Sequence, residues 1–103
     1  ALYKNKKSCN LSRLACTSFF PAKPLGCFGD GGAVFTNCDI LAKKMKSLRI
    51  HGQTDPYVHE YIGLGARLDN IQAAILLIKL RTYDETLNMR KTAAENYNKL
   101  LNK

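Results

Sequence analysis

The chain has 103 residues, 46% hydrophobic and 23% charged, which is the size and composition of one small soluble globular domain. Its longest apolar run, residues 73–78, is much too short to cross a membrane. The net charge of +8 raises the question of nucleic acid, but the basic residues are scattered and no recognition motif accompanies them. A small basic nucleic-acid-binding domain is therefore kept only as an alternative, and we expect no membrane association.

Four cysteines stand in the first part of the chain, at positions 9, 16, 27 and 38. None forms a C-x-x-C pair, and His51 and His59 do not complete a familiar zinc pattern. No secretory signal is visible, so we expect reduced thiols, no metal site and a cytoplasmic location. Because the sequence starts with Ala1 rather than Met, we also expect a piece of a longer protein.

The first third of the chain predicts short strands. Residues 1–7 read as a strand that enters a turn, and residues 14–19 are small and apolar, as in a buried strand that ends at Pro21. Residues 32–36 form another run of the β type. These segments favour a sheet, but they are too few to close one.

The remainder predicts helices. Residues 39–50 place their apolar side chains on one face, and Gly52 follows as a typical terminator. Residues 53–66 read as a loop that contains the turn signal Asp55-Pro56. A helix that starts near Asp69 is apolar nearly all round, so we expect it to be buried inside something larger than itself. Residues 82–103 predict a long amphipathic helix, and the whole list indicates part of an α/β protein.

One stretch stands apart, S-F-F-P-A-K-P-L-G-C-F-G-D-G-G at residues 18–32. Lys23 lies between two prolines, and the residue before a proline is biased towards extended backbone. The glycines that follow permit tight turns and close backbone approach. From this local chemistry alone, a functional lysine and an exposed loop lysine remain equally open.

Together with its neighbours, this stretch resembles the internal-lysine segment of the DegT/DnrJ/EryC1/StrS family of sugar aminotransferases. The resemblance extends through S-L-R-I-H-G-Q at residues 47–53 and I-G-L-G-A-R-L-D-N-I-Q-A-A-I-L at residues 62–76. It implies an α/β fragment of the large domain of the aspartate-aminotransferase type I fold, which binds pyridoxal 5′-phosphate. On this reading residues 1–103 are a partial cofactor-binding domain, and residues 82–103 lead towards a missing C-terminal domain.

The resemblance also implies roles for particular residues. Lys23 falls on the family's Schiff-base lysine, and Ser18 on the serine that hydrogen-bonds the cofactor phosphate. Arg67 matches an arginine that meets a carboxylate of the donor or substrate near the neighbouring subunit's active site. Gly65 stands where relatives usually have an asparagine that reaches the phosphate, and the acid that pairs with the pyridine nitrogen lies upstream of this segment. His51, Tyr57 and His59 are open between a substrate-site role and a structural one.

The implied activity moves an amino group, with glutamate as the expected donor, onto a keto group of a nucleotide-linked sugar. A UDP-linked 3-keto or 4-keto sugar is the expected acceptor, for the synthesis of cell-surface glycans or related amino sugars. We expect a homodimer in the full-length protein and no activity from the 103 residues alone. The alternative is a truncated remnant that keeps packing contacts but no chemistry.

Overall fold

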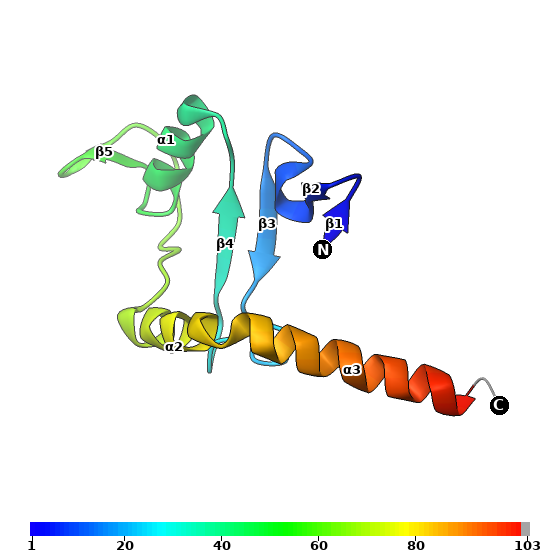
Figure 1. Ribbon diagram of the computed structural model, residues 1–103. Helices are drawn as coiled ribbons and strands as arrows, with labels where there is room; N and C mark the ends of the chain where they lie inside the picture. Colours follow the sequence, from blue (N-terminus) through cyan, green and yellow to red (C-terminus); the bar gives the residue numbers. More distant parts are fainter. Residues whose placement is uncertain (102–103) are drawn as a thin grey trace. The chain divides into compact units, whose positions relative to one another are not determined.

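The computed structural model describes residues 1–101 of the chain, which contain short strands, one 3₁₀ helix and α-helices (Figure 1). In chain order these elements are β1 (Leu2–Tyr3), β2 (Lys6–Lys7), η1 (Ser8–Asn10), β3 (Ala15–Ser18), β4 (Gly32–Phe35), α1 (Asp39–Leu48), β5 (Gln53–Asp55), β6 (Val58–His59), α2 (Asn70–Arg81) and α3 (Tyr83–Leu101). Their contacts divide the chain into two compact units. The first unit is 1–18 with 32–69, and the second is 19–31 with the described residues from 70 onwards.

Strands β3 and β4 lie side by side in the first unit (Figure 1). They pair antiparallel over four residues, from Ala15 opposite Phe35 to Ser18 opposite Gly32. Both strands were expected from the sequence within a residue or two. The short β1–β2 hairpin precedes them, so the strand predicted at the N-terminus is in fact two strands that pair antiparallel.

Helix α1 begins at Asp39 as predicted and ends at Leu48, two residues before the predicted end. Beyond it, the backbone turns through His51 and Gly52, whose φ angles are 64° and 78°. The Gly52 amide donates to the carbonyl oxygen of Ser47 at 2.9 Å, which closes the end of the helix.

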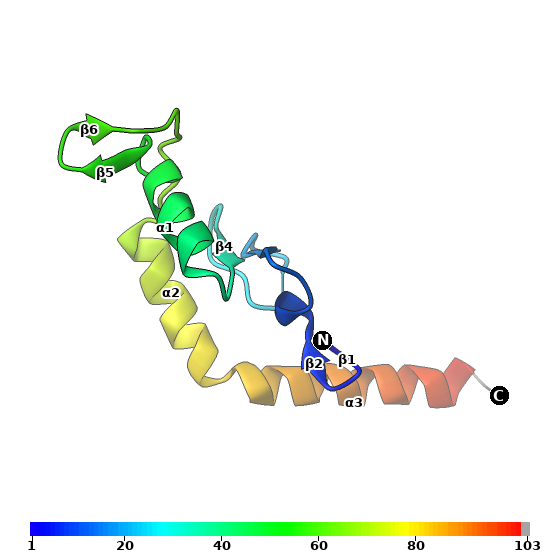
Figure 2. The same ribbon diagram turned by 90° about the horizontal axis from the view of Figure 1, so that it is seen from above.

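Residues 53–66 were expected to be a loop throughout, and this expectation was wrong for the first part. Strands β5 and β6 form a hairpin there that adjoins the end of α1 (Figure 2). The two-residue turn Pro56–Tyr57 joins them. Pro56 takes the first of the two turn positions, and Tyr57 takes the second with a φ of 66°. Gly or Asn usually occupies a turn position with a positive φ, so the sequence did not indicate this turn.

In the second unit, α2 and α3 follow each other almost without a break, and the chain changes direction between them (Figure 2). The helix predicted at 82–103 is observed over Tyr83–Leu101, and its last two residues lie outside the described part. No helix among residues 1–101 is long and apolar enough to span a membrane.

Little apolar surface is buried in the described residues: of the hydrophobic side chains, Cys27 and Leu76 are the ones that count as buried. On α2, Ile71, Leu77 and Ile78 are each more than 60% exposed. Burial of this helix therefore stays a prediction about a larger protein.

Candidate active site

Lys23 lies in a loop, residues 19–31, whose two ends are tied together. The Phe19 amide donates to the Gly31 carbonyl at 2.7 Å, next to the last pair of the β3–β4 ladder. Inside the loop, the Lys23 amide donates to the Phe20 carbonyl at 2.6 Å and closes a β-turn with Pro21 at its second position. The lysine backbone is thereby held in a defined turn.

The Lys23 side chain is exposed, and the structure shows no hydrogen bond or ion pair of its amine within residues 1–101. A lysine whose amine is engaged by a carboxylate cannot condense with a carbonyl compound until that contact breaks. Here the backbone is fixed while the amine is available, which is the combination that a covalent attachment point needs.

Close packing surrounds the second half of the loop. A Cβ atom at Gly26 would lie 2.6 Å from the Phe20 carbonyl oxygen and 2.7 Å from those of Pro21 and Lys23. The backbone of Gly26 therefore packs directly against the carbonyl groups of the turn that contains Lys23. Next to it, the fully buried Cys27 thiol lies 3.0 Å from the Phe19 carbonyl oxygen, to which it donates.

Helix α2 packs on this loop through two polar side chains. The Phe28 amide donates to Gln72 Oε1 at 2.8 Å. The Lys79 ammonium donates to the Gly26 carbonyl at 2.5 Å and lies 4.9 Å from the centroid of the Phe28 ring. The sequence analysis did not identify either contact. The available signal was the spacing: Gln72 and Lys79 are seven residues apart, two turns along one face of an otherwise apolar helix.

Ser18 and Arg67, the other predicted site residues, belong to the first unit, whereas Lys23 belongs to the second. Each is therefore described in its own surroundings. Ser18 is exposed and ends β3 opposite Gly32. Arg67 is also exposed and follows a segment that is bridged to the end of α1, where the Ala66 amide donates to the Arg49 carbonyl at 2.9 Å.

The space beside Gly65 is filled by the imidazole of His51. A Cβ atom at Gly65 would lie 2.9 Å from His51 Cε1 and 3.3 Å from Nε2, so a larger residue at 65 would displace the ring. The His51 carbonyl in turn contacts His59 Nδ1 at 2.9 Å. These histidines thus make local contacts at the base of the β5–β6 hairpin, and a role in a substrate site stays a prediction.

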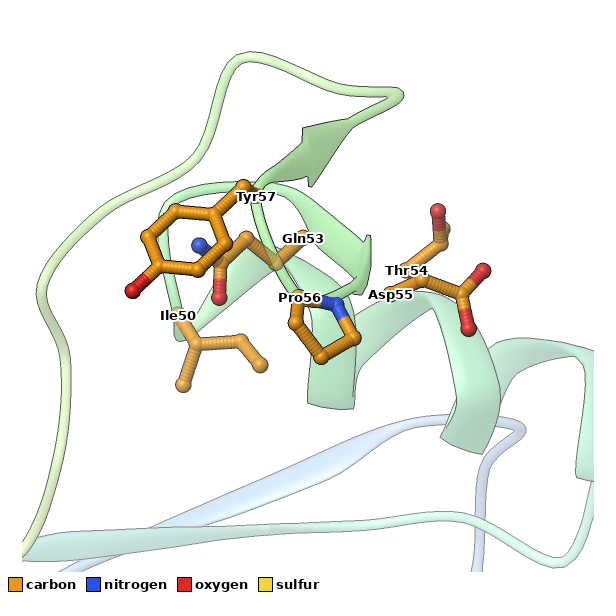
Figure 3. A pocket seen from close by; sticks show the side chains of 6 residues that line it. All are labelled: Ile50, Gln53, Thr54, Asp55, Pro56 and Tyr57. Carbon is orange, nitrogen blue, oxygen red and sulfur yellow. The ribbon is translucent and has the colours of Figure 1, made fainter.

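The third open residue, Tyr57, lines a hollow of about 460 Å³ at the β5–β6 hairpin (Figure 3). Its other lining residues are Ile50, Gln53, Thr54, Asp55 and Pro56. Figure 3 shows the Tyr57 ring beside Gln53, with Thr54 and Asp55 directed to the other side. The hollow is open to solvent and Tyr57 is 91% exposed, so by itself it does not enclose a ligand.

Two titratable groups in the first unit are shifted. The Leu41 amide at the start of α1 lowers the pKa of the Cys38 thiol; partial burial opposes this, and the Ile40 amide and Arg13 add to it. The hydrogen bond from its hydroxyl to Glu60, 3.0 Å long, raises the pKa of Tyr61. Among residues 1–101, no cluster of three metal-binding side chains occurs.

Comparison with known proteins assigns the chain to a family. The model of the DegT/DnrJ/EryC1/StrS aminotransferase family matches residues 1–103, and the chain belongs to this family. A structure of a DegT DnrJ EryC1 StrS aminotransferase from Brucella abortus matches 87% of the chain at 46% identity with a TM-score of 0.83, and is covered over 24% of its own length. These matches confirm the expected α/β fold, a segment of the type I fold of this family.

Two curated relatives carry names that specify different nucleotide-linked sugars. The UDP-2-acetamido-2-deoxy-3-oxo-D-glucuronate aminotransferase of Pseudomonas aeruginosa is 55% identical over 94% of this chain and 27% of its own length. The dTDP-3-amino-3,4,6-trideoxy-alpha-D-glucose transaminase of Streptomyces venezuelae is 42% identical over 94% of the chain and 26% of its own length. The chain thus spans about a quarter of the length of these relatives.

Proposed function

We propose that this chain is the lysine-bearing segment of a pyridoxal 5′-phosphate-dependent sugar aminotransferase, with Lys23 as the residue that holds the cofactor. The observation that supports this most directly is the family match across residues 1–103. Lys23 lies within the matched residues, and its backbone is hydrogen-bonded while its side chain is exposed. Lys23 fits the cofactor, because its exposed amine can take the aldehyde, and Ser18 carries a hydroxyl, a group that can donate to a phosphate.

When bound, pyridoxal 5′-phosphate supplies the electron-withdrawing ring on which amino groups are exchanged. The protein's own residues do the remaining work. Lys23 would hold the group covalently, and its released amine would move a proton to and from the reacting carbon. The Ser18 hydroxyl would donate a hydrogen bond to the phosphate and so orient the group. Arg67 offers a guanidinium to a carboxylate of the amino donor or substrate, a pairing that favours bidentate geometry.

We propose a nucleotide-linked 3-keto sugar as the acceptor, with UDP as the nucleotide and glutamate as the amino donor. The names of both curated relatives include the 3 position of the sugar, and the name of the relative at 55% identity includes a UDP-linked sugar. We further propose a homodimer in the cytoplasm, with Arg67 serving the neighbouring subunit's site. A carboxylate from the chain upstream of residue 1 would complete each site by pairing with the pyridine nitrogen.

The test uses the full-length protein, incubated with pyridoxal 5′-phosphate and then reduced with borohydride. We expect a stable adduct that peptide mapping locates at Lys23, and none in Lys23→Ala. Amino transfer from glutamate to UDP-linked and dTDP-linked 3-keto sugars is then compared, with the UDP sugar expected to be the better acceptor. An adduct at another lysine, or turnover that survives Lys23→Ala, would contradict the proposal.

A further inference from the structure

We propose that Lys79 of α2 is a positioning residue for Lys23: its ammonium holds the loop backbone from which the attachment lysine projects. This inference rests on the proposed function, because it assigns Lys79 a part in the same chemistry. It is drawn from contacts within the second unit, where α2 and the loop 19–31 lie together.

On the loop side, the contact falls at the point where the lysine turn closes. The carbonyl that accepts from Lys79 belongs to Gly26, and the place of a Cβ on Gly26 is occupied by three carbonyl oxygens, including that of Lys23. A group that fixes the Gly26 peptide therefore also limits where the Lys23 backbone can move. The 4.9 Å approach of the same ammonium to the Phe28 ring centroid adds a cation–π contact.

On the helix side, Lys79 is one of three side chains that share a face of α2, and two of the three contact the loop. Gln72, Leu76 and Lys79 are spaced by four and three residues, so they share one face of α2. Leu76 is only 6% exposed, and Gln72 accepts the Phe28 amide. The two polar contacts thus fall on either side of the buried Cys27, at Gly26 and Phe28, and pin this segment at both ends.

The chemistry of the side chain indicates orientation rather than packing alone. Partly burying an ammonium carries a desolvation cost, and a leucine or methionine at 79 would cover the Phe28 ring without it. An apolar residue would, however, leave the Gly26 carbonyl without this donor. A charged donor directed at a single carbonyl fixes the direction of that peptide, which apolar contact does not.

Orientation matters here because the Lys23 amine must reach one carbonyl carbon and return to it in each cycle. Misplacement of a reacting group by about 1 Å can cost roughly a hundredfold in rate. Two turns of helix that hold the neighbouring peptides supply a rigid base for a side chain that has several rotatable bonds.

The experiment compares variants of the full-length protein: Lys79→Met removes the charge and donor and keeps the stem, and Lys79→Arg keeps a cation and donor. Lys91→Met is the matched control, because Lys91 is 76% exposed on α3 and its ion pair is with Glu95, one turn away, at 4.0 Å. Hydrogen exchange of the Cys27 and Phe28 amides is measured without cofactor. The rate of borohydride-trapped attachment of pyridoxal 5′-phosphate to Lys23 is measured separately.

We expect Lys79→Met to exchange these two amides about tenfold faster and to form the Lys23 adduct about tenfold more slowly. Exchange of the β3–β4 amides should stay at the wild-type rate. Lys79→Arg should return both signals to within about twofold of wild type, and Lys91→Met should change neither. If Lys79→Met does not fold, Lys79→Gln replaces it with the same expected direction.

Wild-type exchange and attachment rates in Lys79→Met would overturn the role of Lys79 while leaving the proposed function intact. Failure of Lys79→Arg to recover either signal would also overturn it, since a cation with a donor would then be insufficient. A wild-type protein that forms no adduct at Lys23 would instead contradict the proposed function, and the positioning role with it.

Discussion

Gly26 is a residue of the lysine loop at which any side chain would collide with backbone atoms. An alanine there would place Cβ within 2.7 Å of three backbone oxygens, none of which can move without moving the lysine turn. We expect Gly26→Ala to destabilise the full-length protein by about 2 kcal/mol and to abolish attachment of pyridoxal 5′-phosphate at Lys23.

Urea unfolding and adduct mapping measure the two effects, and Gly29→Ala is the matched control in the same loop. Its Cβ would meet only the flexible Gln72 side chain, at 3.2 Å, so a smaller loss is expected. Equal losses in the two variants would show that Gly26 has no special place in the turn.

Cys38 provides a pH-dependent prediction. Because the Leu41 amide lowers its pKa, the thiolate fraction at any pH near neutrality is larger in the folded protein than in the unfolded chain. The midpoint of Cys38 alkylation by iodoacetamide should therefore lie at lower pH in the native protein than in urea. The folded state favours the thiolate, so the ionisation of Cys38 adds to the stability of the fold at high pH. This contribution is lost as the pH falls through the folded-state pKa.

Arg13→Gln should move the native midpoint of Cys38 part of the way back, since Arg13 is one of the smaller causes of the shift. Coincident midpoints in the native and urea-unfolded proteins would contradict the assignment.

At the scale of elements, the β5–β6 hairpin has a strained turn. Tyr57 has a φ of 66°, and a bulky residue in this left-handed region costs about 1 kcal/mol relative to one that tolerates it. Asparagine adopts such angles more readily, so Tyr57→Asn should raise the free energy of unfolding by about 1 kcal/mol.

Tyr57→Ala is the control for this hairpin, because alanine removes the ring but keeps the steric conflict. Urea unfolding of the full-length protein should therefore show a gain for asparagine and none for alanine. A gain of the same size in both variants would attribute the effect to loss of the exposed ring.

The same hairpin shows where sequence reasoning stops. Helices α1, α2 and α3 were located within about two residues, because their apolar periodicity and end signals are local. The hairpin was not found, since its turn residue Tyr57 lacks the usual Gly or Asn signal. The contacts of Gln72 and Lys79 with the loop join residues 44 and 53 positions apart. The spacing of these two residues indicates a shared helix face, but it does not identify the segment that the face contacts. The family motif indicated Lys23, Ser18 and Arg67, but not what holds the lysine loop.

At the scale of the whole molecule, the exposed apolar faces of α2 predict different behaviour in two contexts. In the 103-residue chain alone, Leu77 and Ile78 are each 64% exposed and should promote self-association. Replacing both with glutamine should reduce self-association of the isolated chain and its binding of a dye that fluoresces on exposed apolar surface. In the full-length protein, where we expect the helix to be buried, the same pair should cost several kcal/mol of stability.

Lys91→Gln, an exposed change on α3, is the control in both contexts. If the two glutamine substitutions cost the full-length protein no more stability than Lys91→Gln does, this face of α2 is not covered there.

The isolated chain is also expected to bind pyridoxal 5′-phosphate poorly and not to transaminate. It spans about a quarter of its curated relatives, and buried hydrophobic side chains are few among its described residues. Amino transfer from glutamate is measured with the isolated chain and added cofactor. Sustained turnover that Lys23→Ala abolishes would contradict this expectation.

The docking of the lysine loop on α2 has a consequence for the order of folding. The loop is synthesised first, but its two anchoring contacts await a helix that emerges from the ribosome 44 to 53 residues later. Closing so large a stretch of chain has an entropic cost, which the contacts with α2 must offset once that helix is made. During translation the lysine loop should therefore gain its contacts with α2 last, and in a nascent chain that ends before Lys79 only the hydrogen bonds within residues 19–31 should hold Lys23.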